Sequence, residues 1–409
     1  MTVIRRKIEI AHRRIDIHVI RGDGTGNTIT AYNQGEVTHT YITPGEYKIT
    51  ILGEINGWQF NNTGDREKIL DITGLKVEYH TDGAIIYAVN GVNLSLYKGE
   101  TLGLVGETGA GKTTIARSIM RILQTPPAKL CGGSINYKGQ EILDLSEKEM
   151  RRIRGNKIAM IFQDPMTALN PIEKVGFQIA ETIAVHNKIT KAEAEKRACD
   201  MLEMVGIPME RYGEYPHQFS GGMKQRVVIA MALACNPELL LADEPTTALD
   251  VTIQAQILDL IRELIRKYKL TCIYITHDLG VVANVADRIA VMYAGDIVEI
   301  GTSEEIFFSP RHPYTWALLS SLPQLGIKGE DLFSIRGTPP NLFQTITGDA
   351  FAPRNPQALN IDFKERPPYF DVSPTHKVRS WLMDQRAPEV KPPAVLSRIS
   401  REGGSLYEG

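Results

Sequence analysis

The sequence contains few cysteines and no excess of either charge. Its four cysteines among 409 residues are far apart, at positions 131, 199, 235 and 272, whereas zinc sites and disulfide frameworks use closely spaced cysteines. We therefore expect reduced, mostly buried thiols of a cytosolic protein. The 48 acidic and 46 basic residues give a formal net charge of −2, so the sequence lacks the basic surplus typical of nucleic-acid-binding proteins.

Long apolar runs are also missing. A bilayer-spanning helix needs roughly 18 or more consecutive apolar residues, and the longest apolar stretch, near Val227 to Cys235, is shorter. Any membrane role is therefore expected to come through partner proteins. At about 150 residues per domain, the length allows two or three domains, and a hydrophobic content of 43% is enough for a sizeable core.

Three segments of different character follow one another along the chain. Residues 1–67 alternate polar and apolar side chains between Pro-Gly and Asn-Gly turn signals, which predicts a small antiparallel β module, an accessory extension rather than a ligand site. Residues 68–325 follow a strand, glycine-rich loop and helix pattern, with a helix-rich insertion at about 165–226, as in nucleotide-binding α/β domains. Residues 326–409 are rich in proline, which predicts a loop-rich extension with a mobile tail.

A phosphate-binding loop is the clearest motif. Residues 106–113 match G-x-x-x-x-G-K-[ST] between a predicted strand and a predicted helix. The glycines let backbone N–H groups surround phosphates, and the helix N-terminus adds partial positive charge. Lys112 is expected to reach the β- and γ-phosphates, and the Thr113 hydroxyl to ligate Mg²⁺. The residues expected to bind the nucleotide here are Gly106, Glu107, Thr108, Gly109, Ala110, Gly111, Lys112, Thr113 and Thr114.

A second element supplies two acids after an apolar run. Residues 239–242 read Leu-Leu-Leu-Ala, and Asp243 and Glu244 follow. A buried central strand would bring both acids to the phosphate site. We expect Asp243 to hold Mg²⁺ through water, and Glu244 to orient and deprotonate the attacking water.

The segment between these elements is specific to one family. Residues 219–226 read Phe-Ser-Gly-Gly-Met-Lys-Gln-Arg, which resembles the signature motif of ATP-binding cassette (ABC) proteins. The family commonly has leucine and glutamine in place of Phe219 and Met223, but the centre formed by Ser220, Gly221 and Gly222 is intact. In the family, this motif faces the γ-phosphate bound to the opposite subunit.

The resemblance assigns roles to four further residues. Gln163 is similar to the glutamine that senses Mg²⁺ and water and couples to the membrane subunits. Asp250 is similar to the aspartate that communicates between the two sites of the dimer, and His277 to the switch histidine that contacts the γ-phosphate. For the aromatic residue that stacks on adenine, Tyr79 is favoured over Tyr87, because Tyr79 precedes a predicted turn and Tyr87 is expected within the next strand.

A second resemblance narrows the subfamily. His-Pro-Tyr-Thr at 312–315, followed by an extension that includes Gly-Asp-Ala-Phe-Ala-Pro-Arg-Asn-Pro at 348–356, resembles the ATPases of oligopeptide/dipeptide importers. The implied fold is a P-loop NTPase with a RecA-like core, an antiparallel β subdomain and a helical subdomain. The implied function is hydrolysis of ATP with Mg²⁺ to drive peptide import. The implied partners are a second, related ATPase subunit, two transmembrane permeases and an extracytoplasmic solute-binding protein, which would place the chain at the cytoplasmic face of the membrane as a peripheral protein with no nucleic-acid partner.

One departure from the subfamily concerns a cofactor. Many members bind an iron–sulfur cluster through four cysteines in the extension, and soft thiolates are what such a cluster requires. We expect no cluster here, because oxygen-bearing residues occupy the matching positions, which are Asp349, Asn355, Asp362 and Ser380.

The sequence is compatible with two alternative functions. Relatives in the same subfamily import oligosaccharides, nickel or other solutes, and the ATPase does not touch the cargo, so peptide is favoured without being separated from these. A cassette ATPase outside transport is the other alternative. Such proteins usually have two cassettes or long coiled coils, and this sequence has neither.

Overall fold

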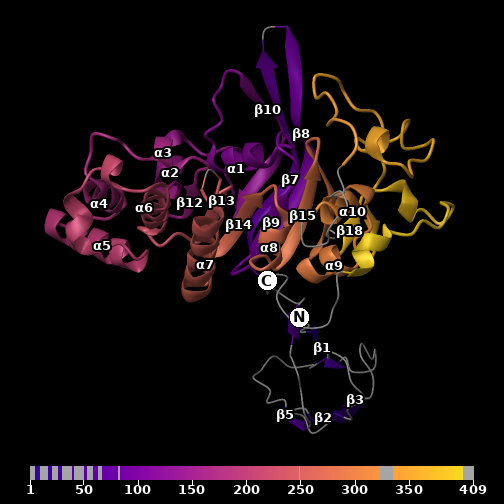
Figure 1. The fold of residues 1–409 in the computed structure, drawn as a ribbon, viewed down its shortest axis with the longest axis horizontal. Helices are drawn as coiled ribbons and strands as arrows, with labels where there is room; N and C mark the ends of the chain where they lie inside the picture. The colour runs from indigo at the N-terminus through magenta and orange to yellow at the C-terminus, as the bar shows by residue number, and fades with distance from the viewer. Residues whose placement is uncertain are drawn as a thin grey trace. The chain divides into compact units, whose positions relative to one another are not determined.

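The structure is a computed structural model of the chain. It describes residues 67–81, 83–247, 249–322 and 335–398, together with the backbone of six short strands between residues 5 and 62. The chain forms two compact units, Met1–Lys68 and Ile69–Gly409 (Figure 1). The tail from residue 399 onward, for which the sequence predicts mobility, lies outside the described residues.

The six described strands of the first unit form two antiparallel sheets of three strands each. In one sheet β1 pairs with β4 and β6, and in the other β2 pairs with β3 and β5. The antiparallel direction agrees with the β module predicted from the alternating pattern, although the Pro-Gly and Asn-Gly turns lie outside the described residues. The strands are β1 (Arg5–Glu9), β2 (Ile17–Ile20), β3 (Gly26–Ile29), β4 (His39–Thr40), β5 (Thr50–Leu52) and β6 (Gln59–Asn62).

A mixed sheet of eight strands forms the centre of the second unit. Its order is β12-β13-β14-β9-β15-β16-β18-β17, and the five strands from β12 to β15 in this order are parallel. The strands are β9 (Thr101–Val105), β12 (Ile158–Ile161), β13 (Leu239–Asp243), β14 (Thr271–Thr276), β15 (Arg288–Tyr293), β16 (Asp296–Thr302), β17 (Phe370–Asp371) and β18 (Lys377–Val378).

The parallel strands are apolar because both faces of this sheet are covered. Successive side chains of a strand point to opposite faces. On β13, Leu239 and Leu241 join one hydrophobic cluster, while Leu240 and Ala242 join the other. All five residues of β13 are buried, so its last residue, Asp243, is buried at the carboxyl edge of the sheet.

A second sheet has four strands in the order β11-β10-β7-β8. Its apolar side chains belong to the hydrophobic cluster that contains Leu239 and Leu241. Antiparallel pairing of β7 with β10 agrees with the predicted antiparallel β subdomain. The strands are β7 (Lys68–Thr81), β8 (Ala84–Tyr97), β10 (Ala128–Tyr137) and β11 (Gln140–Glu141).

Helices cover the main sheet and form a separate layer beside β12. Within the predicted helical insertion, α3 begins at Pro165, while α6 runs beyond the expected end at 226 to Leu233. Figure 1 shows this layer at one end of the sheet and the C-terminal extension at the other. The helices are α1 (Lys112–Met120), α2 (Glu147–Ile153), α3 (Pro165–Ala168), α4 (Val175–His186), α5 (Lys191–Met204), α6 (Gly221–Leu233), α7 (Val251–Tyr268), α8 (Leu279–Ala283), α9 (Ser303–Phe308) and α10 (Pro313–Ser320).

The C-terminal extension is loop-rich, as predicted, and is also part of the main sheet. Its strand β18 pairs with β16. Beside this pairing, His376 Nε2 lies 2.7 Å from Glu299 Oε1, with both side chains buried. The extension is therefore attached to the core of the second unit by ladder hydrogen bonds and by a buried polar contact.

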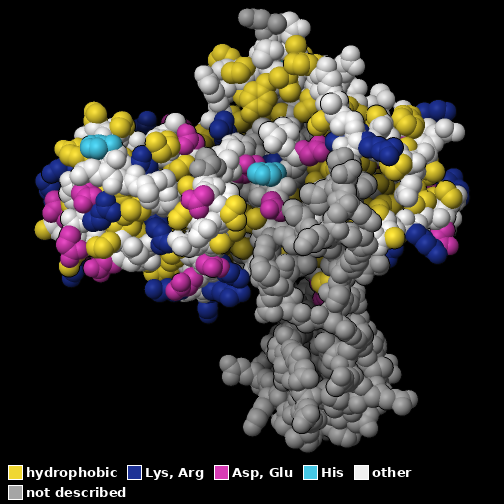
Figure 2. Space-filling view, in the orientation of Figure 1, with side chains coloured by type: hydrophobic (Ala, Val, Ile, Leu, Met, Phe, Trp, Pro, Cys, Tyr) yellow, Lys and Arg dark blue, Asp and Glu magenta, His cyan; other side chains and the backbone are white. Residues whose placement is uncertain are grey.

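The surface of the second unit carries both charges. Figure 2 shows acidic and basic side chains interspersed with apolar ones over helices α4 to α7, which agrees with the near-zero net charge. Within the described residues, none of the helices combines the length and apolar content needed to cross a bilayer.

Candidate active site

The phosphate loop connects buried β9 to helix α1. Gly111 is the N-cap of α1 and has a φ of 101°, a backbone conformation that favours glycine. A Cβ on Gly111 would lie 2.3 Å from the Ala88 carbonyl oxygen, and a Cβ on Gly106 would lie 2.0 Å from the Met292 carbonyl oxygen. Glycine is therefore required at both ends of the loop for the backbone to pack against neighbouring strands.

Lys112 lies inside the loop. Its Nζ donates to the carbonyl oxygens of Gly106 at 2.7 Å and Glu107 at 3.0 Å, and it lies 3.8 Å from Glu244 Oε1. Burial lowers the pKa of Lys112, and the nearby carboxylates, Glu244 first, oppose this shift. The ammonium is thus held at the centre of the loop by weak acceptors that an anionic ligand can replace.

Thr113 and Asp243 form a pair of hard oxygen donors. Thr113 Oγ1 donates to Asp243 Oδ1 at 2.9 Å. Burial raises the pKa of Asp243, while the hydrogen bond from Thr113 opposes this effect. A hydroxyl and a carboxylate are the ligand types that Mg²⁺ prefers, so these two residues fit the metal that the sequence predicts.

Glu244 is the meeting point of the predicted catalytic residues. Its Oε2 accepts from Gln163 Nε2 at 3.2 Å and from Thr247 Oγ1 at 3.0 Å, and lies 3.4 Å from His277 Nδ1. Glu244 has a φ of 44°, and its N–H donates to the Ile275 carbonyl oxygen. The chain therefore turns sharply just after β13, and the Glu244 carboxylate lies among residues from three separate segments.

Tyr79 lies beside the first helix of the site. Its Oη is 3.2 Å from Thr114 Oγ1 on α1. Tyr87 lies within β8, as predicted, and its N–H donates to the Leu342 carbonyl oxygen of the extension. Of the two candidates for adenine stacking, Tyr79 is the one next to the phosphate loop helix; Asp82, part of the turn used in that prediction, lies outside the described residues.

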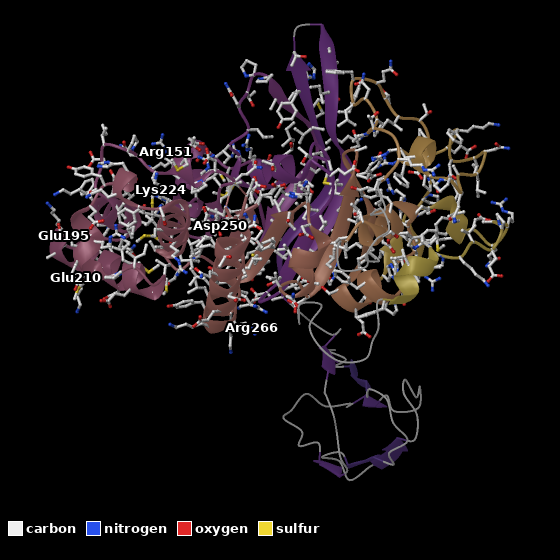
Figure 3. All side chains as sticks on the ribbon, in the orientation of Figure 1. Arg151, Glu195, Glu210, Lys224, Asp250 and Arg266 are labelled. Carbon is white, nitrogen blue, oxygen red and sulfur yellow. The ribbon has the colours of Figure 1, made fainter. Side chains whose placement is uncertain are left out.

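The signature residues lie apart from the loop. Ser220 caps α6 and accepts from the Met223 N–H, and Gly222 is next to α7, where a Cβ would lie 2.5 Å from Ile253 Cγ2. Asp250 caps α7 (Figure 3) and accepts from the Ile253 N–H at 2.9 Å. Ser220 and Asp250 are exposed, and no hydrogen bond or ion pair of the described residues joins either of them to the phosphate loop.

The sequence reasoning missed one contributor to the loop. Arg354 of the C-terminal extension makes two hydrogen bonds to the Glu107 carboxylate, at 2.8 and 3.1 Å. The N–H of Glu107 donates to Tyr314 Oη at 2.9 Å, so this N–H is occupied by protein rather than facing a phosphate as expected. Arg354 and Tyr314 lie in segments that served in the sequence only to identify the subfamily. Both are far from residue 107 along the chain, so no local pattern indicates the contact.

The residues at the positions of the cluster cysteines do not fit an iron–sulfur cluster. All four are buried, and none carries a thiol. Each accepts a nearby backbone N–H, as an oxygen side chain does in a tight turn. The pairs are Asp349 with Phe351, Asn355 with Gln357, Asp362 with Leu359, and Ser380 with Leu382.

The cysteines that are present lie elsewhere and are free. The expectation that they are mostly buried is wrong, because only Cys272 is buried, within β14. Cys131 is exposed on β10, where one face of that antiparallel strand borders solvent.

Comparison with known proteins identifies two families in the chain. The family described as ABC transporter matches residues 89–247, and the family described as oligopeptide/dipeptide transporter, C-terminal region, matches residues 298–361. The chain is 55% identical to the oligopeptide transport ATP-binding protein OppD of Bacillus subtilis (strain 168), over 83% of this chain and 96% of that protein. It is 53% identical to the dipeptide transport ATP-binding protein DppD of Lactococcus lactis subsp. cremoris, over 82% of this chain and 97% of that protein.

A solved structure shares the same fold. The ATP-binding cassette MJ0796, in a dimeric post-hydrolysis state bound to ADP and Pi, is 29% identical with a TM-score of 0.52, covering 57% of this chain and 98% of that one. This likeness agrees with the ABC ATPase fold expected from the sequence.

The loop geometry predicts different costs for two glycine substitutions. Gly109 has a φ of 84°, and a Cβ added there would have nothing within 4 Å, so Gly109→Ala should lower the free energy of unfolding by only about 1–2 kcal/mol. Gly111→Ala should lower the free energy of unfolding by a larger amount and abolish ATP binding, because the added Cβ would overlap the Ala88 carbonyl oxygen. Urea unfolding of both nucleotide-free variants measures the difference, and equal losses would contradict it.

Proposed function

The chain belongs to the ABC transporter ATPase family, in its oligopeptide/dipeptide branch, and on this premise we propose that it hydrolyses ATP to drive the import of short peptides. The observation that carries the proposal is the convergence of Lys112, Gln163 and His277 on the Glu244 carboxylate, beside the pair formed by Thr113 and Asp243. The names of its relatives as oligopeptide and dipeptide transport proteins favour peptide cargo.

The proposed reaction uses these residues in sequence. Lys112 exchanges the carbonyl oxygens of Gly106 and Glu107 for the β- and γ-phosphates of ATP, and Tyr79 stacks on adenine. Mg²⁺, held by Thr113 and Asp243, would neutralise phosphate charge. Glu244 takes a proton from the attacking water.

His277 and Gln163 support that proton transfer. Both already contact Glu244 Oε2, so they orient its carboxylate before the water arrives. Positioned acid–base groups of this kind contribute roughly 10²–10⁴-fold to rates.

Each site needs a second subunit to be complete. Ser220, Gly221 and Gly222 start a helix whose N-terminus can bind an anion, yet among the described residues no hydrogen bond or ion pair joins them to this chain's own phosphate loop. We therefore assign them, with Asp250, to the nucleotide held by a partner ATPase. The partner is proposed to be a second, related chain.

The permease subunits are proposed to dock beside Gln163. Four exposed large apolar side chains of this chain lie between residues 162 and 177, and exposed apolar groups at this density mark protein interfaces. Such docking would hold the chain at the cytoplasmic face of the membrane. The four side chains are Phe162, Met166, Ile172 and Phe177.

The proposed domain division follows the sequence. Residues 68–325 form the ATPase, with its helical subdomain at about 165–226, and residues 326–409 form the subfamily extension. Residues 1–67 are proposed to be an accessory β module, since neither family match extends into them and Met1–Lys68 form a compact unit of their own.

A substitution of the proposed base separates binding from turnover. Glu244→Gln keeps the hydrogen-bonding shape but removes the charge, so ATP hydrolysis by the assembled transporter should fall roughly 10²–10⁴-fold while ATP remains bound. Glu263→Gln, at an exposed position on α7, is the matched control and should leave turnover unchanged. Undiminished hydrolysis in the Glu244 variant would show that the partner's site performs the chemistry.

Cargo is tested on the receptor, because the ATPase does not contact the solute. The cognate extracytoplasmic binding protein should bind short peptides in calorimetric titrations, and the same peptides should stimulate ATP hydrolysis by the assembled complex. Selective binding of an oligosaccharide or of nickel instead would overturn the peptide assignment and leave the ATPase assignment intact.

A further inference from the structure

The second residue of the phosphate loop is held from outside the ATPase core. Arg354 Nη1 donates to Glu107 Oε2 at 2.8 Å, and Nη2 donates to Oε1 at 3.1 Å. The Arg354 side chain is 6% exposed and that of Glu107 is 23% exposed. A bidentate pair shielded from water is stronger and more directional than a surface ion pair.

The backbone of Glu107 is held as well. Its N–H donates to the hydroxyl of Tyr314, a fully buried residue of α10. Tyr314 packs against Tyr293 and Phe351, with ring centroids 4.5 and 5.3 Å away. Arg354 also donates to Tyr293 Oη at 3.1 Å, so the groups that hold the side chain and the backbone of Glu107 form one packed cluster.

The residue held by this cluster, Glu107, also contacts Lys112. The Glu107 carbonyl oxygen is one of the two acceptors of Lys112 Nζ. The Glu107 carboxylate bears a negative charge close to where ATP phosphates would bind. Arg354 cancels that charge, and without it the loop would present an unpaired carboxylate to an anionic ligand.

The loop that carries Arg354 is shaped by the oxygen side chains described above. The Asp349 N–H donates to the Asp362 carbonyl oxygen at 2.7 Å, and both carboxylates accept backbone N–H groups within the same loop. Gly348 is required there, because a Cβ would lie 2.0 Å from the Asp362 carbonyl oxygen. The rigid loop aims the Arg354 guanidinium at Glu107.

We propose that Arg354 is a positioning residue through which the C-terminal extension sets the ATP affinity of the phosphate loop. It holds the Glu107 side chain and neutralises its carboxylate, so a change in the extension changes nucleotide binding. The inference rests on the proposed function only in taking this loop as the ATP site.

The test compares ATP affinity and turnover in full-length variants. Arg354→Ala should raise the Kd for ATP about tenfold or more, as expected when a partly buried carboxylate loses its partner, with a smaller change in kcat of the assembled complex. Arg354→Lys keeps a positive charge and should recover part of the affinity. Arg354→Ala combined with Glu107→Gln should bind ATP more tightly than Arg354→Ala alone, because the unpaired charge is gone.

Arg366→Ala is the matched control. Arg366 lies in the same extension and pairs with Asp296 of β16, so its loss tests general loosening of the extension and should leave ATP affinity unchanged. Wild-type affinity in Arg354→Ala, or no recovery in the double variant, would overturn the proposal. Failure of the wild-type chain to bind ATP would instead overturn the proposed function.

An independent observation points to a metal site on the β subdomain. Glu78 and His80 lie on the same side of β7, two residues apart, and Cys131 lies on β10 between residues whose register shifts. One ligand atom from each of the three lies within 4.8 Å of the other two. A bulge re-aims side chains in this way, and sequence spacing gave no sign of it because the three residues come from two strands.

We infer that Glu78, His80 and Cys131 bind a zinc ion. Thiolate, imidazole and carboxylate are its usual ligands, and the partly exposed position leaves room for water as the fourth. His80 Nε2 lies 2.8 Å from Glu78 Oε2, so little movement is needed to gather the ligands. Two of the ligands, Glu78 and His80, are the sequence neighbours of Tyr79. A zinc ion that links them to Cys131 on β10 would therefore restrain the residue proposed to stack on adenine.

Titration of the reduced, tag-free, full-length protein with Zn²⁺ tests this site. One equivalent should bind, and Co²⁺ should give a thiolate-to-metal absorption band. Cys131→Ser and His80→Ala should each weaken Zn²⁺ binding roughly 10-fold or more, since even outer-shell losses cost this much. Cys199→Ser is the control and should bind normally. No binding by the wild-type protein, or equal binding by Cys131→Ser, would overturn the site.

Discussion

The burial of Lys112 is the constraint on which the site depends. An ammonium with 4% of its side chain exposed is stable only when acceptors and opposite charges surround it. Two loop carbonyls accept its hydrogen bonds, and the Glu244 carboxylate supplies the opposite charge. Parallel strands bring these groups together, because β9 and β13 lie on either side of β14 and their carboxyl ends reach the same edge of the sheet. The hydrophobic strands therefore position the charged groups of Lys112 and Glu244 beside each other.

Polar side chains extend from this lysine in both directions. On one side lies the Glu244 carboxylate, which contacts His277 and Gln163. Toward the extension, Glu107 is followed by Arg354. The ion pair between Glu107 and Arg354 is largely shielded from water, and electrostatic interactions are strong in such surroundings. The ATPase core and its C-terminal extension thus share one electrostatic network centred on the phosphate loop.

The C-terminal extension is kept folded without metal-binding cysteines. Four buried oxygen side chains each accept a backbone N–H and so cap a turn. They belong to Asp349, Asn355, Asp362 and Ser380. Buried oxygen atoms are stable in such turns because they have partners, and the segment is further anchored by β18 and by the contact between His376 and Glu299. Local hydrogen bonds, rather than a shared metal cluster, hold the segment that presents Arg354.

Local patterns determined much of this protein. The spacing of glycines, Lys112 and Thr113 identifies the loop from the sequence alone, because phosphate binding demands small residues and a helix start at fixed intervals. The apolar run before Asp243 likewise indicates a buried strand. Tertiary structure alone decided which distant residues share the site: Arg354 meets Glu107 across 247 positions, and Cys131 approaches His80 through a bulge. Such contacts depend on strand order and register, which no short stretch of residues encodes.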